Sequence, residues 1–345
     1  MLKLGNGRYR VLRSGEKSVA AKIFALIRCC DTIVRAELTV RVVFCLLFSL
    51  SLLSCKSTRP VVKIGLLAPF EGLHRESGYE ALSAMRAALA DFPPKEFEAI
   101  PLALDTSADP AHARRAAAKM LRDDSVVAVV GPLQAPQVSA VAQIIVASGV
   151  EWQPQARPPS TEAAQNLIEA IIARMPGTNI AVAGLEFGWP QTSAAELSSN
   201  TGKSVSLVDA AADGAEADAV LWLGSAVEGA AFLSRLRLLG RTVPFWTTAV
   251  AGNPVFHSLL LERLDGASPG PNYWAIALSE NGDHYMQWAS AHEDAPPTAF
   301  AVYQATQRAL QQIAGDDLPS GERDLAVFSL DLEGKSELIE IVRLP

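Results

Sequence analysis

One stretch constrains the fold more than any other, residues 105–150, which read DTSADPAHARRAAAKMLRDDSVVAVVGPLQAPQVSAVAQIIVASGV. Asp109 before Pro110 predicts a helix start, because Asp accepts a hydrogen bond at the N-cap and Pro already has the helical φ. The run VVAVV at 126–130 is typical of a buried parallel strand. A second helix follows and ends at Gly149. The stretch therefore predicts a unit of a doubly wound α/β sheet, in which ligands bind at the carboxyl ends of the strands.

Strands and helices alternate along the rest of the chain. Further strands are predicted at 61–67, 100–104, 179–183, 204–208, 219–223, 243–247 and 273–278. Further helices are predicted at 77–90, 160–174, 227–239 and 298–314, with one ending at 200, and a β-hairpin is predicted at 325–344. This alternation predicts parallel sheets with right-handed crossovers. At 345 residues and 49% hydrophobic content, the chain is long enough for two domains with their own cores.

Charge and cysteine content exclude several classes of function. Residues 1–54 contain nine Lys/Arg and three Asp/Glu, so the rest of the chain carries 21 against 34, a net charge of -13. Such an acidic body disfavours nucleic acid as a partner, because phosphate binding needs a basic surface. The four cysteines are Cys29, Cys30, Cys45 and Cys55. The body therefore has neither a disulfide framework nor a thiolate metal site.

The N-terminal region resembles a lipoprotein leader. Residues 42–54, VVFCLLFSLSLLS, suit the apolar region of a signal peptide, and Leu52-Leu53-Ser54-Cys55 resembles the bacterial lipobox. That resemblance implies lipidation of Cys55, with residues 56–60 as a polar tether. The alternatives are an uncleaved anchor or a buried apolar strand. Residues 1–40 indicate either a start codon assigned too early, which we favour, or an unusually long leader.

Several phrases of the body resemble one family. They are VKIGLLAP at 62–69, DDSVVAVVGP at 123–132, Phe187-Gly188, Asp218-Ala219-Val220 and Ala301-Val302-Tyr303. Together with the element order, they resemble the periplasmic binding protein type I fold, in the leucine/isoleucine/valine-binding type of substrate-binding lipoproteins of ABC transporters. The resemblance implies two doubly wound parallel-sheet lobes joined by three hinge crossings, closing on a small ligand. Lobe 1 would comprise 61–157 and 279–324, and lobe 2 would comprise 158–278 and 325–345.

The chain departs from this family where ligands are anchored. Family members place Ser or Thr shortly after the Gly-Pro, and here that position falls on Gln134-Ala135-Pro136. The next Ser/Thr-rich segment is shortened to residues 151–155. Where an acidic residue often meets the ligand ammonium, this chain reads Phe245-Trp246-Thr247-Thr248-Ala249, and where Tyr-Asp is common it has Tyr303-Gln304. The resemblance therefore does not carry amino-acid specificity. Backbone N–H groups near 135–137 are expected to remain available to an anion or a carbonyl.

The candidate ligand-binding residues lie in the loops expected after Leu67, Val130, Ala183, Leu223 and Thr247. They are Phe70, Gln134, Ala135, Pro136, Trp152, Phe187, Trp189, Ser225, Trp246 and Thr247. The five aromatic residues among them are expected in loops at strand ends, where they either enclose an apolar or ring-shaped ligand or plug a cleft that has lost its ligand.

No catalytic or metal-binding motif accompanies these loops. The five His residues lack metal-ligand spacing, and nucleotide or hydrolase motifs are absent, so neither an enzyme nor a bound cofactor or metal is expected. The favoured hypothesis is an extracytoplasmic, lipid-anchored solute-binding protein that delivers a small molecule to a membrane permease of an ABC transporter. The alternative is a non-transporting sensor or regulator on the same fold, for example an activator of a cell-wall enzyme.

Overall fold

A computed structural model describes residues 59–155, 161–185, 189, 193–209, 216–278, 282–292, 295–315, 324–331 and 334–344. The helices and strands of the described residues all belong to one compact unit, Pro60–Pro345. The expected leader and Cys55 lie outside the described residues, so lipidation stays a prediction.

Four parallel strands form the first sheet, in the order β2-β1-β3-β4. Their bounds are β1 Val61–Ala68, β2 Glu98–Asp105, β3 Val126–Val130 and β4 Glu151–Gln153. The central strands β1 and β3 have the most continuous apolar sequences, because helices cover both of their faces. The predictions for β1, β2 and β3 are confirmed.

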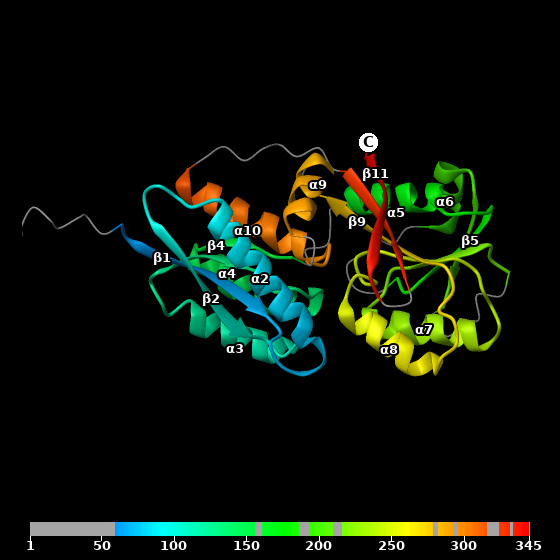
Figure 1. Cartoon of the computed structure of the whole chain (residues 1–345), viewed down its shortest axis with the longest axis horizontal. Coiled ribbons are helices and arrows are strands. Elements are labelled where there is room, and N and C mark those ends of the chain that lie inside the picture. The colour runs from blue at the N-terminus through cyan, green and yellow to red at the C-terminus, as the bar shows by residue number, and fades with distance from the viewer. Residues whose placement is uncertain are drawn as a thin grey trace, which may run out of the picture. The chain divides into compact units, whose positions relative to one another are not determined.

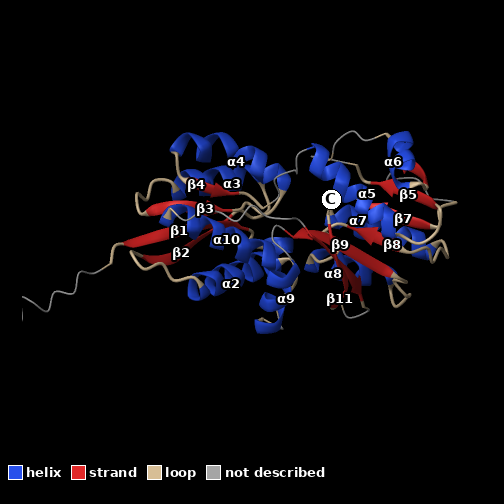
Figure 2. Ribbon diagram, turned by 90° about the horizontal axis from the view of Figure 1, so that it is seen from above, coloured by secondary structure: helices blue, strands red, loops and turns tan. Residues whose placement is uncertain are grey.

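Helices from two distant parts of the chain cover this sheet. They are η1 Gly72–His74, α2 Arg75–Asp91, α3 Pro110–Met120, α4 Ala135–Ser148 and α10 Ala299–Ala314. On one face, α3 and α4 bury Leu67 and Val129. On the other face, α2 packs against α10, which also contacts β3 and β4 (Figures 1 and 2). Helix α10, although it comes late in the chain, thus helps to cover one face of the first sheet.

Seven strands form the second sheet, in the order β11-β10-β9-β8-β7-β5-β6. Their bounds are β5 Asn179–Ala183, β6 Ser204–Val208, β7 Ala219–Trp222, β8 Phe245–Thr247, β9 Asn272–Leu278, β10 Asp324–Leu330 and β11 Ser336–Arg343. Strands β5 to β9 are parallel, whereas β10 runs antiparallel to both β9 and β11. The α/β class is confirmed, and the expected C-terminal hairpin makes the second sheet mixed rather than wholly parallel.

Helices also cover both faces of the second sheet. They are α5 Thr161–Arg174, α6 Ala194–Thr201, α7 Ala226–Leu238 and α8 Pro254–Leu264. One face buries residues of α5 and α6 with Leu221 and Trp246, and the other buries residues of α7 and α8 with Trp222 and Phe245. Helix α9, Gly282–Ala291, is fastened to β10, because the Gly282 N–H donates to Asp324 Oδ2 at 2.6 Å.

The chain passes between the two sheets three times, after β4, after β9 and after α10. The residue limits expected for the lobes stay a prediction. Four elements have no counterpart among the predicted ones, namely η1, β4, α8 and α9. Strand β4 contains Trp152, which was expected in a loop, and its pairing with β3 corrects that expectation.

Candidate ligand-binding site

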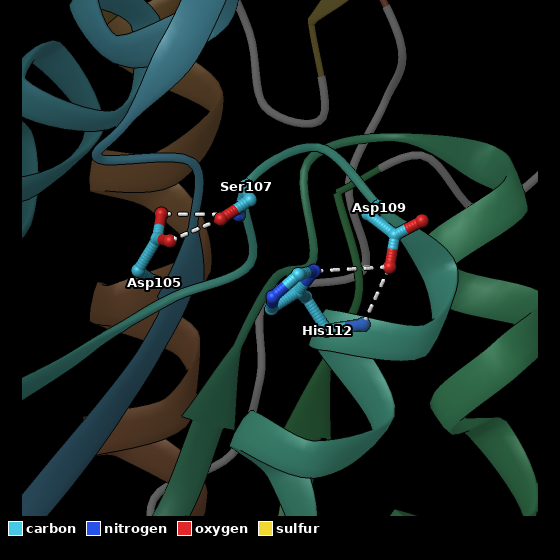
Figure 3. A network of polar contacts seen from close by, with 4 residues as sticks. All are labelled: Asp105, Ser107, Asp109 and His112. Carbon is cyan, nitrogen blue, oxygen red and sulfur yellow. Dashed lines mark hydrogen bonds and ion pairs between the residues drawn. The ribbon is translucent and has the colours of Figure 1, made fainter.

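At the carboxyl end of the first sheet, one carboxylate holds two loops together. Asp105, the last residue of β2, accepts hydrogen bonds from the Ser107 N–H at 3.0 Å and from the Ser107 hydroxyl (Figure 3). It also accepts a hydrogen bond from the Phe70 N–H at 2.6 Å. Burial would raise the pKa of Asp105, but the hydrogen bonds from Ser107, Phe70 and Glu71 outweigh it and hold this pKa below its ordinary value. Asp105 therefore positions Phe70, whose ring packs edge-on against Tyr79 with centroids 5.6 Å apart.

The turn after Asp105 has an unusual backbone. Ser107 and Ala108 have positive φ values of 49° and 51°, and the Asp109 N–H closes the turn onto Thr106 O at 2.9 Å. Non-glycine residues in this region are strained. The turn leads into α3, where Asp109 is the N-cap and accepts from the His112 N–H at 2.7 Å (Figure 3). The predicted helix start is confirmed, and the strain lies directly beside the candidate site.

The loop after β3 turns at Gly131, which has a φ of 88° and is followed by a cis bond to Pro132. Gln134 is the N-cap of α4 but makes no side-chain cap hydrogen bond, and Ala135 and Pro136 open the helix. Pro136 lacks an N–H and the Gln137 N–H donates to Gln134 O at 3.1 Å. The expectation of free N–H groups across 135–137 is therefore wrong for two of the three residues, and only Ala135 can offer one.

Trp152 lies in β4 rather than in a loop, which corrects its expected position. Its Nε1 donates to Gly131 O at 2.7 Å, and its ring packs on the cluster between α3, α4 and the sheet. The Trp152 indole thus stabilises the turn at Gly131. Its contact with a ligand stays a prediction.

At the carboxyl end of the second sheet, an indole occupies the space between three segments. Trp222, the last residue of β7, is 1% exposed, stacks on Phe232 and donates from Nε1 to Ser225 O at 3.0 Å. A Cβ at Gly224 or at Gly229 would lie 2.7 Å from this ring, and one at Gly184 would lie 3.0 Å from it. Glycine at these positions lets the loops after β5 and β7 and the start of α7 close around Trp222. Sequence reasoning missed this residue, because it lies inside a correctly predicted strand.

The other residues expected in this region fall into two groups. Ser225 is exposed, but as the N-cap of α7 its hydroxyl accepts from the Glu228 N–H at 3.3 Å and contacts Glu228 Oε2 at 2.8 Å. Trp189 is half-buried against the cluster under α5. Phe187 lies outside the described residues. Whether these residues touch a ligand stays a prediction.

Trp246 and Thr247 belong to strand β8 and face the core. Trp246 is 6% exposed and stacks on Tyr273 with centroids 4.9 Å apart, so it lies inside the strand predicted at 243–247 and not in the loop that follows it. Thr247 is fully buried, and its hydroxyl donates to Thr248 O at 2.7 Å. Neither side chain offers a free polar group at the strand end, apart from the buried Trp246 Nε1, which has no hydrogen-bond acceptor.

The loop after β8 touches the helices of the first sheet. The Ser77 hydroxyl, in the first turn of α2, contacts Asn253 Oδ1 at 3.3 Å, and the Thr298 hydroxyl donates to Gly252 O at 3.4 Å. Near this contact, burial and the neighbouring Glu76 raise the pKa of Glu80 on α2 to about 7. These polar contacts join the starts of α2 and α10 to the loop after β8 and were not expected from the sequence.

The described residues show neither of two other kinds of site. Within the described ranges, no group of three or more His, Cys, Asp and Glu residues is placed to hold a metal ion. None of the helices in this part of the chain combines the length and apolarity needed to cross a bilayer. The candidate site is therefore made of loops, backbone groups and aromatic side chains.

Comparison with known proteins identifies the fold. No family model and no curated protein sequence matches the chain. Among solved structures, a solute-binding protein of an ABC transporter from R. palustris, in complex with 4-hydroxybenzoate, is 16% identical and aligns over 83% of this chain and 98% of its own, with a TM-score of 0.61. A leucine-binding protein from Thermotoga maritima is 14% identical over 81% of this chain and 98% of its own, with a TM-score of 0.58. The chain has the type I periplasmic binding protein fold.

Another structure with this type I fold widens the range of ligands. It is a fatty acid ABC transporter substrate-binding protein from Thermomonospora curvata, 12% identical over 82% of this chain and 92% of its own, with a TM-score of 0.56. The same fold thus holds an amino acid, an aromatic acid or a fatty acid in different proteins, according to the names of these structures. Ligand choice on this fold must come from the loops, as a fold alone does not determine function.

Proposed function

We propose that the chain is an extracytoplasmic solute-binding protein of an ABC uptake system, held at the membrane by lipid on Cys55, which delivers a small ligand to a permease. The observation that carries the proposal is the two-sheet fold, in which the start of α2, after β1, contacts the loop after β8 through Ser77 and Asn253. Ligands of open α/β sheets bind at this edge. The shared fold of the ABC transporter binding proteins supports the role.

The ligand we propose is a monoanionic or neutral compound with an apolar body, rather than a zwitterionic amino acid. Two segments that often carry an acidic residue in amino-acid-binding proteins read Phe245-Trp246-Thr247-Thr248-Ala249 and Tyr303-Gln304 here, and the Thr247 and Gln304 side chains are buried. An ammonium group enclosed without a carboxylate partner would be strongly disfavoured. Phe70, by contrast, is only half-buried and is held in the loop after β1 by Asp105. A ring or an acyl chain could pack against it.

A thermal-shift screen of the full chain tests the proposal. The compounds are leucine, isoleucine, 4-hydroxybenzoate, 3,4-dihydroxybenzoate, benzamide and octanoate. A ligand at 100 times its Kd stabilises the folded state by about 2.7 kcal/mol, which raises the melting temperature by roughly 4 °C for a protein of this size. We expect a shift with one of the acids or the amide and none with the amino acids. Phe70→Ala should reduce the shift, while Tyr79→Ala, whose ring is exposed, serves as the control for lost aromatic packing.

A folded sample that shifts with none of these compounds would favour the second candidate, a sensor or regulator without transport. The observation that favours this alternative is the local use of polar groups. The Ser225 and Thr247 hydroxyls are both engaged within their own loops. A shift with leucine alone would instead overturn the ligand class proposed above.

Intact mass spectrometry of the protein extracted from membranes tests the anchor. We expect a mature form that begins at Cys55 with a diacylglycerol mass added, and Cys55→Ser should abolish both the cleavage and the added mass. An unlipidated N-terminus upstream of Cys55 would contradict this part of the proposal while leaving ligand binding untouched.

A further inference from the structure

Helix α3 carries an unpaired basic face in an otherwise acidic body. Four cations lie on its outer side and in the following turn, and all four are exposed: Arg114, Arg115, Lys119 and Arg122. From Pro110 to Arg122 the chain contains no Asp or Glu. None of the four cations makes an ion pair with the described carboxylates. Residues 55–345 carry a net charge of -13, so a cluster of four cations without a carboxylate between them runs against the charge of the rest of the body.

The ordinary explanation covers only half of the face. Cations in the last turn of a helix are favoured by the helix dipole, which accounts for Lys119 and Arg122. Arg114 and Arg115 lie in the first half of α3, where cations gain nothing from the dipole. The apolar stripe of Ala113, Ala117 and Met120 faces the sheet, so Arg114 and Arg115 do not pack in the core either.

The end of this face lies beside the start of the folded unit. Lys63 in β1 forms an ion pair with Asp123, directly after the basic face, at 2.6 Å, and the Lys63 N–H donates to Ser125 O at 2.7 Å. The Glu98 N–H donates a hydrogen bond to Pro60 O at 2.9 Å, which fixes the point where the tether joins the first sheet. Five tether residues, 56–60, span at most about 18 Å when extended. A lipid on Cys55 would therefore hold this edge of the first sheet close to the membrane.

We propose that the outer face of α3, formed by Arg114, Arg115, Lys119 and Arg122, binds the anionic headgroups of the membrane that anchors the chain. This rests on the proposed lipid at Cys55. Such a face acts as the second signal that a single anchor needs for stable attachment, and each cation near an anionic surface strengthens association roughly fivefold. The carboxylates of Asp124, two residues after the face, and of Glu96 and Glu98, next to and in β2, are also exposed. The face would set which side of the protein faces the lipid.

Arginine labelling of the full chain in vesicles tests the orientation directly. The protein is reconstituted into vesicles of phosphatidylcholine alone or with 30% phosphatidylglycerol, a composition chosen to give about the surface potential of an anionic membrane, and treated with phenylglyoxal. We expect Arg114, Arg115 and Arg122 to be labelled several-fold more slowly on the anionic vesicles. The exposed Arg75, Arg86 and Arg263, on α2 and α8, are internal controls and should be labelled equally on both.

Two matched variants separate the face from net charge. Arg115→Glu with Lys119→Glu should remove the protection of Arg114 and Arg122, whereas Arg75→Glu with Arg86→Glu makes the same change in net charge and should keep it. Equal labelling on both vesicles, equal protection of the control arginines, or equal protection by soluble glycerol phosphate would each overturn the proposal. In the same samples, the lipid mass on Cys55 and the thermal shift with ligand test the proposed function. A failure of the proposed function is therefore distinguished from a failure of the membrane-facing proposal.

Discussion

The carboxyl ends of the two sheets occupy equivalent places in the fold but are held by different forces. At the first sheet, Asp105 draws the Phe70 loop and the strained Ser107-Ala108 turn together through hydrogen bonds. At the second sheet, the buried indole of Trp222 fills the space that three glycines leave. The first end depends on charge and backbone geometry, and the second on apolar packing. The two ends should therefore respond differently to mutation, pH and ligand.

The largest expected effect is at the second sheet. Trp222→Ala should lower the free energy of unfolding by about 3–5 kcal/mol, because it removes a fully buried aromatic ring and leaves a cavity. Urea denaturation measures this change, with Trp189→Ala as a half-buried control that should cost clearly less. Equal losses for the two variants would mean that Trp222 is not the packing centre of its loops.

The corresponding change at the first sheet should be smaller and dependent on pH. Asp105→Ala should cost about 2 kcal/mol, because it leaves the Phe70 N–H without its charged acceptor. The pKa of Asp105 is lowered by its hydrogen bonds, so its stabilising contribution is present above the ordinary value of 3.8 and is lost as the pH falls through the folded-state pKa. Asp105→Asn should therefore flatten the acid limb of the stability curve. An unchanged acid limb would show that Asp105 titrates alike in both states.

Glu80 on α2 should change the stability with pH in the direction opposite to Asp105. Burial and Glu76 raise its pKa from 4.5 to about 7, so the folded state holds this proton more tightly than the unfolded state. Its contribution is present below pH 4.5 and is lost as the pH rises through 7. Between pH 5 and pH 8, Glu80→Gln should become more stable than the parent by about 1–2 kcal/mol, a value reduced by solvent screening. Glu262→Gln, exposed on α8, is the control and should show no such trend.

The sequence predicted elements better than it predicted the site. The strand Asn179–Ala183 was placed to the residue, because its short apolar run follows Pro176-Gly177 and stops at Gly184, which is typical of a buried strand. The N-cap at Asp109 follows from local chemistry in the same way. Helix α8 was missed although Asn253 and Pro254 open it with the same signal. Its many leucines and phenylalanine hide the polar face from which helical periodicity is read.

The site residues were harder to predict because their roles depend on contacts between distant segments. Trp152 was expected in a loop and lies in the three-residue strand β4, which single-sequence patterns rarely separate from a loop. Trp246 lies within the strand predicted at 243–247, but its burial against Tyr273 depends on a contact with a distant segment. Trp222 gained its role from Gly184, Gly224 and Gly229, which are spread over two loops and a helix. No spacing rule in the sequence joins such positions, because the indole that connects them is seen only in three dimensions.

The smallest expected effect tests whether the first sheet end stores strain. Ala108→Gly should raise the free energy of unfolding by about 0.5–1 kcal/mol, because glycine accepts a φ of 51° without the Cβ clash that alanine suffers there. The gain is less than the full relief of strain, since glycine also gains freedom in the unfolded chain. Ala118→Gly, ten residues on in the regular helix α3, is the matched control and should cost about 1 kcal/mol. If both variants lose stability equally, the Asp105 hydrogen bonds do not hold a strained turn. If Ala108→Gly is more stable but binds ligand more weakly, the strained backbone of this turn is needed for ligand binding. The two sheet ends would then differ in function as well as in the forces that hold them.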